Sequence, residues 1–531
     1  MKQVLHVQVT LYTIAVLLGT VYLCTQAYSV RRISHDDAIS YLAATGHQGQ
    51  YQASKPGQRW TYASQWQDFW TPDKFWCFTK IARDLATTDI HPPMYFWSLH
   101  VWSMLYGVTL ATGPLLNIPF HILACLTITA VCRFLGCAPW IAGATGLLWL
   151  FCGANLYVVA EARPYSLLAA VSVIYVLSIL CFLRRPSIST SSFVCLTSTV
   201  GMLTHYHFIL LLAVCGGMAA FQLLFERRYF ELFMFASSIV LAGLFFVVVH
   251  PTFFLSFQRQ VLQSQVFDWV EIPARLRLVL HTMLEVFIPH RIVSPLVINA
   301  SHFCLLVLTV VLTGMAVFLY HAKGLNLGGL ARKLIRPKSI PFVASITCFL
   351  FIVLLYVSFR SPRHAMGAKY LMIVTPLFFI ALGQIIAALN SIRHTMAVVI
   401  VVVLLISQIT YGTMVTVQSL ERVWQPHVNP LRGRDAILVL DSTARGVLPT
   451  VLWHADPELS VFASEQKFLL ADGFPVLPAH RVVLYVSDIR YQNSKTGREA
   501  LLHTFSNLGY EVSKLSETYF FHYSEAYVMV P

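Results

Sequence analysis

Long apolar runs recur along most of the chain and are separated by short polar segments. Each run holds about 20 residues, the length that an α-helix needs to cross about 30 Å of hydrocarbon. A helix satisfies its own backbone hydrogen bonds, so repeated runs of this length predict a polytopic membrane protein. The predicted spans are 5–28, 115–133, 139–160, 164–183, 191–205, 206–225, 230–250, 299–320, 340–359, 370–389 and 396–416.

The run at 94–112 is apolar and aromatic, but His91-Pro92-Pro93 precedes it and His100 interrupts it. If this run does not cross and the N-terminus is inside, the basic residues of the short loops fall in the cytoplasm, as the positive-inside rule requires. These residues are Arg133, Arg184, Arg185, Arg227, Arg228, those of the 321–338 loop and Arg393. We therefore expect an interfacial or re-entrant helix here, about eleven spans, and a long first extracytoplasmic loop at 29–114.

Composition agrees with this architecture. The chain is 57% hydrophobic and only 11% charged, whereas soluble domains carry about 25% charged residues. The net charge of +13 lies mostly in the short loops, so it indicates membrane orientation and not a nucleic-acid partner. The 11 cysteines have no zinc spacing, and we expect them to be small core residues. The first run lacks a small-x-small cleavage site and is expected to be a retained helix.

From about residue 431 the pattern changes to short apolar runs at 436–441 and 481–488, which are typical of buried strands. A helix at 501–508 and a last strand near 518–529 complete the pattern. The predicted fold class is an all-α polytopic membrane protein, residues 1–416, with a small C-terminal extracytoplasmic α/β domain, residues 417–531. This domain has no Gly-rich phosphate loop or nucleophile elbow, so we expect it to serve packing or acceptor docking.

Acidic residues flank the first loop at both ends. Asp36 and Asp37 follow the first span, and Asp89 stands beside His91 before the 94–112 run. Chains seldom place carboxylates at a bilayer surface without a use. A helix cap would explain one acid, whereas an Asp whose basicity is raised by a neighbouring acid suits a general base. The three carboxylates could also ligate a divalent metal ion, although their spacing does not demand one.

Basic side chains are expected at the same membrane surface. Arg163 follows Glu161 in a corner between two spans, against the positive-inside trend. It could form a structural pair with Glu161, or its guanidinium could bind phosphate oxygens. A later cluster with Arg363 and Lys369 could attract lipid headgroups in general, or build a pocket for one anionic headgroup with Arg163. The remaining candidates on this face are Tyr165, His205, His207 and Tyr370.

In this order, these residues resemble the membrane glycosyltransferases of the GT-C fold that use polyprenyl-phosphate sugars. The resemblance is to the glycosyltransferase family 39 branch, which includes protein O-mannosyltransferases and the aminoarabinose transferase acting on lipid A. The matching segments are His35-Asp36-Asp37, Asp89 to Tyr95, Ala162 to Leu167, and Lys369-Tyr370-Leu371. They cover roughly residues 1–416. Each motif alone is weak, but the ordered set is fairly specific.

The resemblance implies an inverting transfer of one sugar from a polyprenyl-phosphate donor to a hydroxyl of a cell-envelope acceptor. Asp36 matches the acid that activates the acceptor, and Arg163 and Lys369 match contacts to the lipid phosphate. No nucleotide or other cofactor is required. The sequence departs from the pattern at Asp37, where Glu is usual, and at Lys369, where Arg is usual, so the bidentate fork is lost there.

Two other classes of membrane protein are alternatives. A transporter or lipid flippase would place charges near the bilayer centre and often shows internal repeats, whereas here the polar groups gather at one surface. A ligase or polymerase of lipid-linked oligosaccharides would carry its large outer loop between late spans. The sequence leaves the sugar and the acceptor open, and it favours a bacterial inner membrane with an outward-facing site.

Overall fold

A computed structural model describes residues 2–30, 33–53, 60–72, 74–89, 91–255, 258, 339–359, 368–424, 436–441, 447–464, 482–488, 492–514 and 524–530. The predicted span at 299–320 and the candidate Arg363 lie outside these residues.

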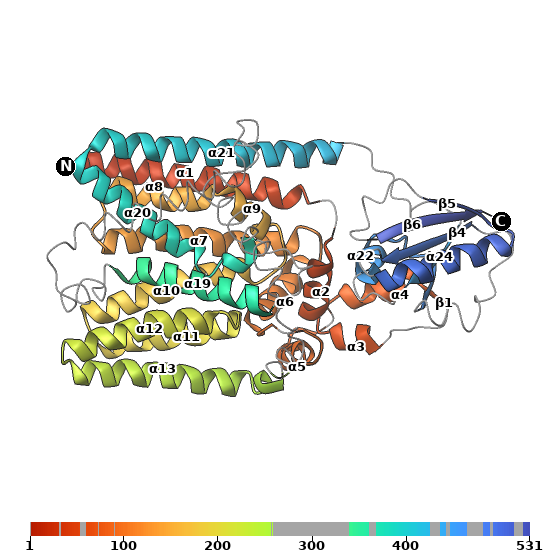
Figure 1. The fold of residues 1–531 in the computed structure, drawn as a ribbon, viewed down its shortest axis with the longest axis horizontal. Helices are drawn as coiled ribbons and strands as arrows, with labels where there is room; N and C mark the ends of the chain where they lie inside the picture. Colours follow the sequence, from red (N-terminus) through yellow and green to blue (C-terminus); the bar gives the residue numbers. More distant parts are fainter. Residues whose placement is uncertain are drawn as a thin grey trace.

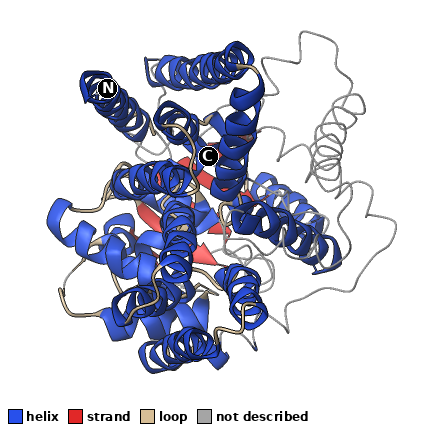
Figure 2. Ribbon diagram, turned by 90° about the vertical axis from the view of Figure 1, so that its left-hand side faces the viewer, coloured by secondary structure: helices blue, strands red, loops and turns tan. Residues whose placement is uncertain are grey.

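Most of the described chain forms a bundle of apolar helices that lie side by side (Figures 1 and 2). Seven described helices are long and apolar enough to cross a membrane, or eight if the bent pair α8–α9 is one span. The polytopic membrane architecture is therefore confirmed, while the total of about eleven spans stays a prediction. The bundle comprises α1 (Lys2–Tyr28), α7 (Thr112–Phe134), α8 (Pro139–Leu150), α9 (Gly153–Val159), α10 (Tyr165–Arg184), α11 (Ile188–Thr204), α12 (Phe208–Phe225), α13 (Tyr229–Val249), α19 (Ile340–Phe359), α20 (Thr375–Ile392) and α21 (His394–Trp424).

Helix α10 lies in the interior of the bundle, in contact with α7, α11, α12 and α20. It is apolar on nearly every side, and such a helix is stable only where protein or lipid surrounds it. Within the 18-residue apolar stretch of α10 that could cross a membrane, 83% is buried inside the protein, against 11% for the corresponding stretch of α1. The corner that carries Glu161 and Arg163 therefore leads into the most enclosed of the spanning helices.

The predicted span 139–160 is not a single straight helix. It breaks between α8 and α9, whose axes differ by 54°. The backbone N–H of Gly153 at the break donates to Oε1 of Gln408 on α21 (2.9 Å). This side chain replaces a partner that the interrupted helix no longer supplies, which makes the break tolerable at membrane depth.

The first loop folds into short helices at one end of the bundle: α2 (His35–Ala44), α3 (Gln48–Ala53), α4 (Ala63–Gln67), η1 (Asp68–Trp70), α5 (Phe78–Thr88) and α6 (Met94–Tyr106). Helix α6 has 13 residues and is about 20 Å long at 1.5 Å per residue, too short to cross the hydrocarbon. The histidine within it, His100, bonds the carbonyl oxygens of Ala44 and Phe75 (2.7 and 2.8 Å). It is thus satisfied by the loop and not exposed to lipid.

Beyond this end of the bundle lies a mixed six-stranded sheet (Figure 1) with the order β1-β3-β2-β4-β6-β5. Strands β2, β3 and β4 are parallel, and the other pairs are antiparallel. Helix α21 runs to Trp424, past the expected boundary at 416, and β3 is a strand that the sequence pattern did not indicate. The elements are β1 (Trp60–Tyr62), β2 (Ala436–Asp441), α22 (Val447–His454), β3 (Ser460–Ser464), β4 (Val482–Asp488), α24 (Gln492–Asn507), β5 (Glu511–Lys514) and β6 (Ser524–Val530).

The sheet and the first loop are built together. Strand β1 belongs to the loop, yet it pairs antiparallel with β3, so that Trp60 lies opposite Phe462. Helix α22 packs on α2 and α4. Its Trp453 stacks on Tyr41 of α2 (centroids 5.6 Å apart) and meets the edge of Trp70 (5.5 Å). The C-terminal sheet therefore supports the helix that carries Asp36.

Replacing this tryptophan should loosen the junction. We expect Trp453→Ala to cost about 3 kcal/mol, the low end for a large core aromatic, because the side chain is only partly buried. The matched control is Trp76→Ala, since Trp76 is 81% exposed. The apparent Tm of the two purified variants measures the difference, and equal values would contradict the proposed junction.

Candidate active site at one end of the bundle

Successive spanning helices run in opposite directions, so their connections fall at two ends (Figure 1). The C-terminal ends of α7, α10, α12 and α20 lie at the end where the N-terminus also lies (Figure 1), and these helix ends carry Arg133, Arg184, Arg227 and Arg393. The first loop, the α9–α10 corner, the α11–α12 turn and η5 (Ala368–Leu371) lie at the other end, facing the sheet. Acidic and basic candidates that are far apart in sequence meet there.

Asp36 lies between two cations. Its Oδ1 is 3.3 Å from Nη2 of Arg163, and its Oδ2 accepts a hydrogen bond from Nζ of Lys369 (2.9 Å). The three side chains come from α2, the α9–α10 corner and η5. About a third of the Asp36 side chain is exposed (35%), whereas the Arg163 side chain is 9% exposed. A ligand can therefore approach the carboxylate side of this cluster.

Two further carboxylates complete the ion cluster. Glu161 Oε2 lies 3.3 Å from Lys369 Nζ, and Asp89 Oδ2 lies 3.9 Å from Nη1 of Arg163. The other oxygen of Asp89 is 2.9 Å from Nδ1 of His91. Each cation thus faces two carboxylates, with Asp36 common to both.

Asp37 has different contacts from its neighbour. It is buried, and its Oδ2 accepts hydrogen bonds from the hydroxyl and the N–H of Ser34 (2.7 and 3.3 Å) in a capping box that begins α2. Its Oδ1 accepts the N–H of Ala162 (2.6 Å). These bonds join α2 to the corner before α10, so Asp37 fixes Asp36 opposite Arg163 while its own oxygens contact Ser34 and Ala162.

The corner is held from a second side. The amide of Asn117 on α7 donates to the carbonyl oxygens of Val159 (3.1 Å) and Glu161. Asn117 is fully buried, and a buried amide is stable only when it is hydrogen-bonded. Bonds from α2 and α7 therefore determine where Glu161 and Arg163 point.

Ser40 is a site residue that the sequence analysis missed. Its hydroxyl donates to the carbonyl of Asp36 (2.9 Å) and accepts a bond from Nη1 of Arg163 (3.3 Å). Ser40 lies four residues after Asp36 on a helix, so both face the same side. That spacing is the signal that would have identified it.

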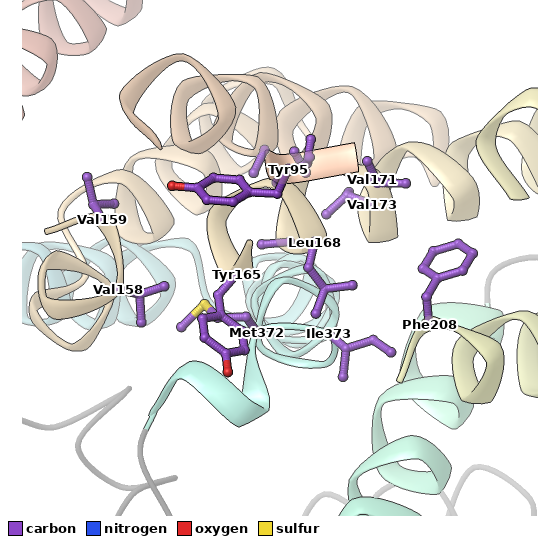
Figure 3. Packing of buried hydrophobic residues seen from close by; sticks show 14 of the residues in the cluster. Tyr95, Val158, Val159, Tyr165, Leu168, Val171, Val173, Phe208, Met372 and Ile373 are labelled. Carbon is purple, nitrogen blue, oxygen red and sulfur yellow. The ribbon is translucent and has the colours of Figure 1, made fainter. Parts of the chain in front are cut away.

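Aromatic and imidazole rings line the base of the cluster. Tyr165 lies 5.6 Å from His205 and 6.1 Å from Tyr370, measured between ring centroids. His205 also lies 5.6 Å from His91 and 4.6 Å from His207. Figure 3 shows Tyr165 with Leu168, Met372 and Ile373 in one buried apolar cluster, which extends further to Phe208. This packing holds the polar residues at the rim of the bundle.

The charged groups of the cluster change one another's pKa values. Arg163 lowers the pKa of Asp36 far below its usual range, and Lys369 adds to this effect. The raised basicity expected of Asp36 is therefore not found in this arrangement, because the two cations outweigh the neighbouring acid. Burial raises the pKa of Glu161 above its ordinary value, against the attraction of Lys369.

The three aspartates considered as metal ligands are engaged elsewhere. Asp36 contacts the two cations, Asp37 accepts backbone and hydroxyl donors, and Asp89 contacts His91 and Arg163. In the ranges that the structure describes, no three His, Cys, Asp or Glu side chains are grouped so as to hold a metal ion.

No protein-family model and no curated protein matches this chain. Solved structures are similar to it in fold. ArnT from Cupriavidus metallidurans bound to undecaprenyl phosphate is 13% identical, with a TM-score of 0.50 over 98% of this chain and 97% of that one. The apo state of the same protein gives a TM-score of 0.51 over the same shares, again at 13% identity.

The present chain has the GT-C fold. The archaeal oligosaccharyltransferase of Archaeoglobus fulgidus is also similar, at 11% identity and a TM-score of 0.47 over 90% of this chain and 69% of that one. The GT-C fold that the ordered motifs of this sequence predicted is confirmed. The roles of the individual residues stay predictions.

Asp37 offers a direct test of how this site is held. We expect Asp37→Asn to destabilise the protein by about 1–3 kcal/mol, because the buried amide can no longer accept every donor that Ser34 and Ala162 present. Asp68→Asn is the matched control, since Asp68 is an exposed acid of the same loop. Thermal unfolding of both variants tests this role, and an unchanged apparent Tm for Asp37→Asn would refute it.

Proposed function

We propose that this protein is an integral membrane glycosyltransferase that moves a monosaccharide from a polyprenyl-phosphate donor to a hydroxyl of a cell-envelope acceptor. The observation that carries the proposal is the placement of Asp36 against Arg163 and Lys369 at one end of a GT-C bundle. A carboxylate beside two cations supplies both a proton acceptor and a site for a leaving phosphate.

The cations suit the donor's phosphate. Arg163 and Lys369 converge from two segments on one point, and Nε of Arg163 is buried with no hydrogen-bond partner among the described residues. A guanidinium with an unused donor is a strong site for a phosphate oxygen. ArnT, which shares the fold, binds undecaprenyl phosphate. This supports a lipid phosphate as the ligand here, with its tail among the apolar helices.

The step that we propose is a single inverting displacement. The acceptor oxygen attacks the anomeric carbon as the bond from that carbon to the phosphate oxygen breaks. Asp36 takes the acceptor's proton, and the electron pair of the broken bond leaves with the phosphate. Arg163 and Lys369 stabilise the negative charge that grows on the leaving group. Asp37, Asp89, Glu161 and Ser40 hold these three residues in place.

The distribution of charge supports an extracytoplasmic site. The arginines of the short loops lie at the end of the bundle opposite the ion cluster. Short loops rich in Lys and Arg are retained in the cytoplasm. The cluster and the C-terminal sheet would therefore face outward from a bacterial inner membrane, where acceptors of the cell envelope are accessible.

Transfer can be measured with the protein in liposomes, labelled polyprenyl-phosphate monosaccharide and a cell-envelope extract as the source of acceptors. The proposal expects label in an acceptor fraction and release of polyprenyl phosphate. Transfer only from a diphosphate-linked oligosaccharide would indicate a ligase, and movement of intact donor between leaflets without transfer would indicate a flippase. Either result would overturn the proposal.

Asp36→Asn should abolish most of the activity. An amide of the same shape cannot take the proton, and loss of a general base lowers rates by about 100- to 10,000-fold. The variant must retain a normal gel-filtration profile, and Asp68→Asn should transfer at the wild-type rate. Normal turnover by Asp36→Asn would end this mechanism.

Lys369 should affect donor binding more than chemistry. We expect Lys369→Met to raise the donor KM about tenfold or more, because a charge-assisted contact to phosphate is lost. Lys369→Arg keeps the charge and should recover most of the affinity. The donor KM of each variant, at saturating acceptor, is the measurement. An unchanged KM in Lys369→Met would remove Lys369 from the phosphate site.

A further inference from the structure

The ion cluster already contains more acid than base. Asp36, Asp89 and Glu161 lie within 4.0 Å of Arg163 or Lys369. Three carboxylates against two cations give a formal charge of −1 for the contacting groups. A phosphate brought into this cluster adds further negative charge to a site of low hydration, which is costly unless a carboxylate moves away.

The geometry favours Asp36 as the carboxylate that moves. It alone of the three contacts both cations, so a phosphate oxygen that reaches either one competes with it. Its side chain is 35% exposed, whereas that of Asp89 is 13% exposed and bonded to His91. Glu161 is also partly exposed (33%) but contacts Lys369 alone.

We propose that the donor's phosphate displaces Asp36 from Arg163 and Lys369, and that only the displaced carboxylate acts as the base. This inference rests on the proposed function. Before the donor binds, Asp36 serves as a substitute anion that neutralises the two cations. Once the phosphate takes that place, Asp36 loses the contacts that make it a weak base. The donor would therefore bind before productive proton transfer to the acceptor.

The groups that face Asp36 support this order. Among the charges around it, Arg163 lowers the pKa of Asp36 most, Lys369 less and His35 on its own helix least, while burial acts in the opposite direction. Asp37 and Glu161 are the acids close by. When a phosphate neutralises the two strongest cations, the neighbouring acids dominate and the carboxylate becomes a better proton acceptor.

Competition of this kind predicts that removing Asp36 improves binding of the lipid phosphate. The test measures the affinity of the full-length protein for undecaprenyl phosphate in detergent, in wild type and in Asp36→Asn. We expect Asp36→Asn to bind more tightly by about 5- to 150-fold, the usual range for coupling between two sites. Equal or weaker binding would overturn the inference, because Asp36 would then remain on the cations or assist the phosphate.

Asp68→Asn controls for the general loss of one negative charge. Asp68 is an exposed acid of the same loop, and exposed charges are screened by salt at distances beyond about 10 Å. We expect its affinity for undecaprenyl phosphate to equal that of wild type at 0.15 M salt. A gain in Asp68→Asn as large as that in Asp36→Asn would assign the effect to net charge and reject the competition.

A charge-balanced pair keeps the test decisive if Asp36→Asn does not fold. Lys369→Met is compared with the double variant Asp36→Asn/Lys369→Met, in which one acid and one base are removed together. The double variant should still bind undecaprenyl phosphate more tightly than Lys369→Met, because Arg163 is freed. The gain should be smaller than that from Asp36→Asn in the wild-type background, since one of the two shared cations is gone. No gain in this pair would also overturn the inference.

The same data separate the inference from the proposed function. If wild type does not bind undecaprenyl phosphate and transfers no sugar from a polyprenyl-phosphate donor, the proposed function fails. If wild type binds and transfers, but Asp36→Asn gains no affinity, the proposed function stands and the displacement of Asp36 is rejected.

Discussion

The candidate site depends on one buried carboxylate that does not face it. Asp37 accepts hydrogen bonds from Ser34 at the start of α2 and from Ala162 in the corner before α10. The two segments are 125 residues apart in sequence, and the backbone bonds within each helix cannot bring them together. A buried carboxylate is stable only when both of its oxygens accept hydrogen bonds. The bonds of Asp37 to Ser34 and Ala162 therefore fix the distance between α2 and the corner before α10. Asp36 and Arg163 then meet because Asp36 is next to Asp37 itself, and Arg163 is next to Ala162, which Asp37 holds.

The charged side chains of the cluster differ in how far the fold buries them. Arg163 precedes the enclosed helix α10, and its side chain is only 9% exposed. Asp36 and Lys369 come from a short loop helix and a short 3-10 segment, and both are partly exposed. A buried cation is stable only with a close anion, and this requirement keeps Asp36 in contact. The proposed base, Asp36, thus has the most exposed side chain of the three, 35% against 20% for Lys369 and 9% for Arg163.

The sequence predicted much of this arrangement, and its errors have physical causes. Apolar run length identified the spanning helices that the structure describes, and the ordered motifs led to Asp36, Asp89, Arg163 and Lys369, which the structure brings together. The break after α8 was missed, because its stabilising partner, Gln408, is about 250 residues away. The roles of the two adjacent aspartates could not be told apart, since only the packing shows that one faces the cations and the other the framework. Strand β1 was missed because three residues give no periodicity without their partner β3.

The pairing of β1 with β3 also constrains how the chain is made. Thr61 and Val461 are 400 residues apart and bond across the edge of the sheet. During synthesis β1 must therefore wait for its partner until every later span and the start of the C-terminal segment have been made. A fragment that begins after α21 would carry β3 with an unpaired edge, a surface that invites association with other chains. The first loop and the C-terminal sheet therefore form one structural unit. A chimaera that exchanges the sheet between homologous proteins needs the first loop from the same protein.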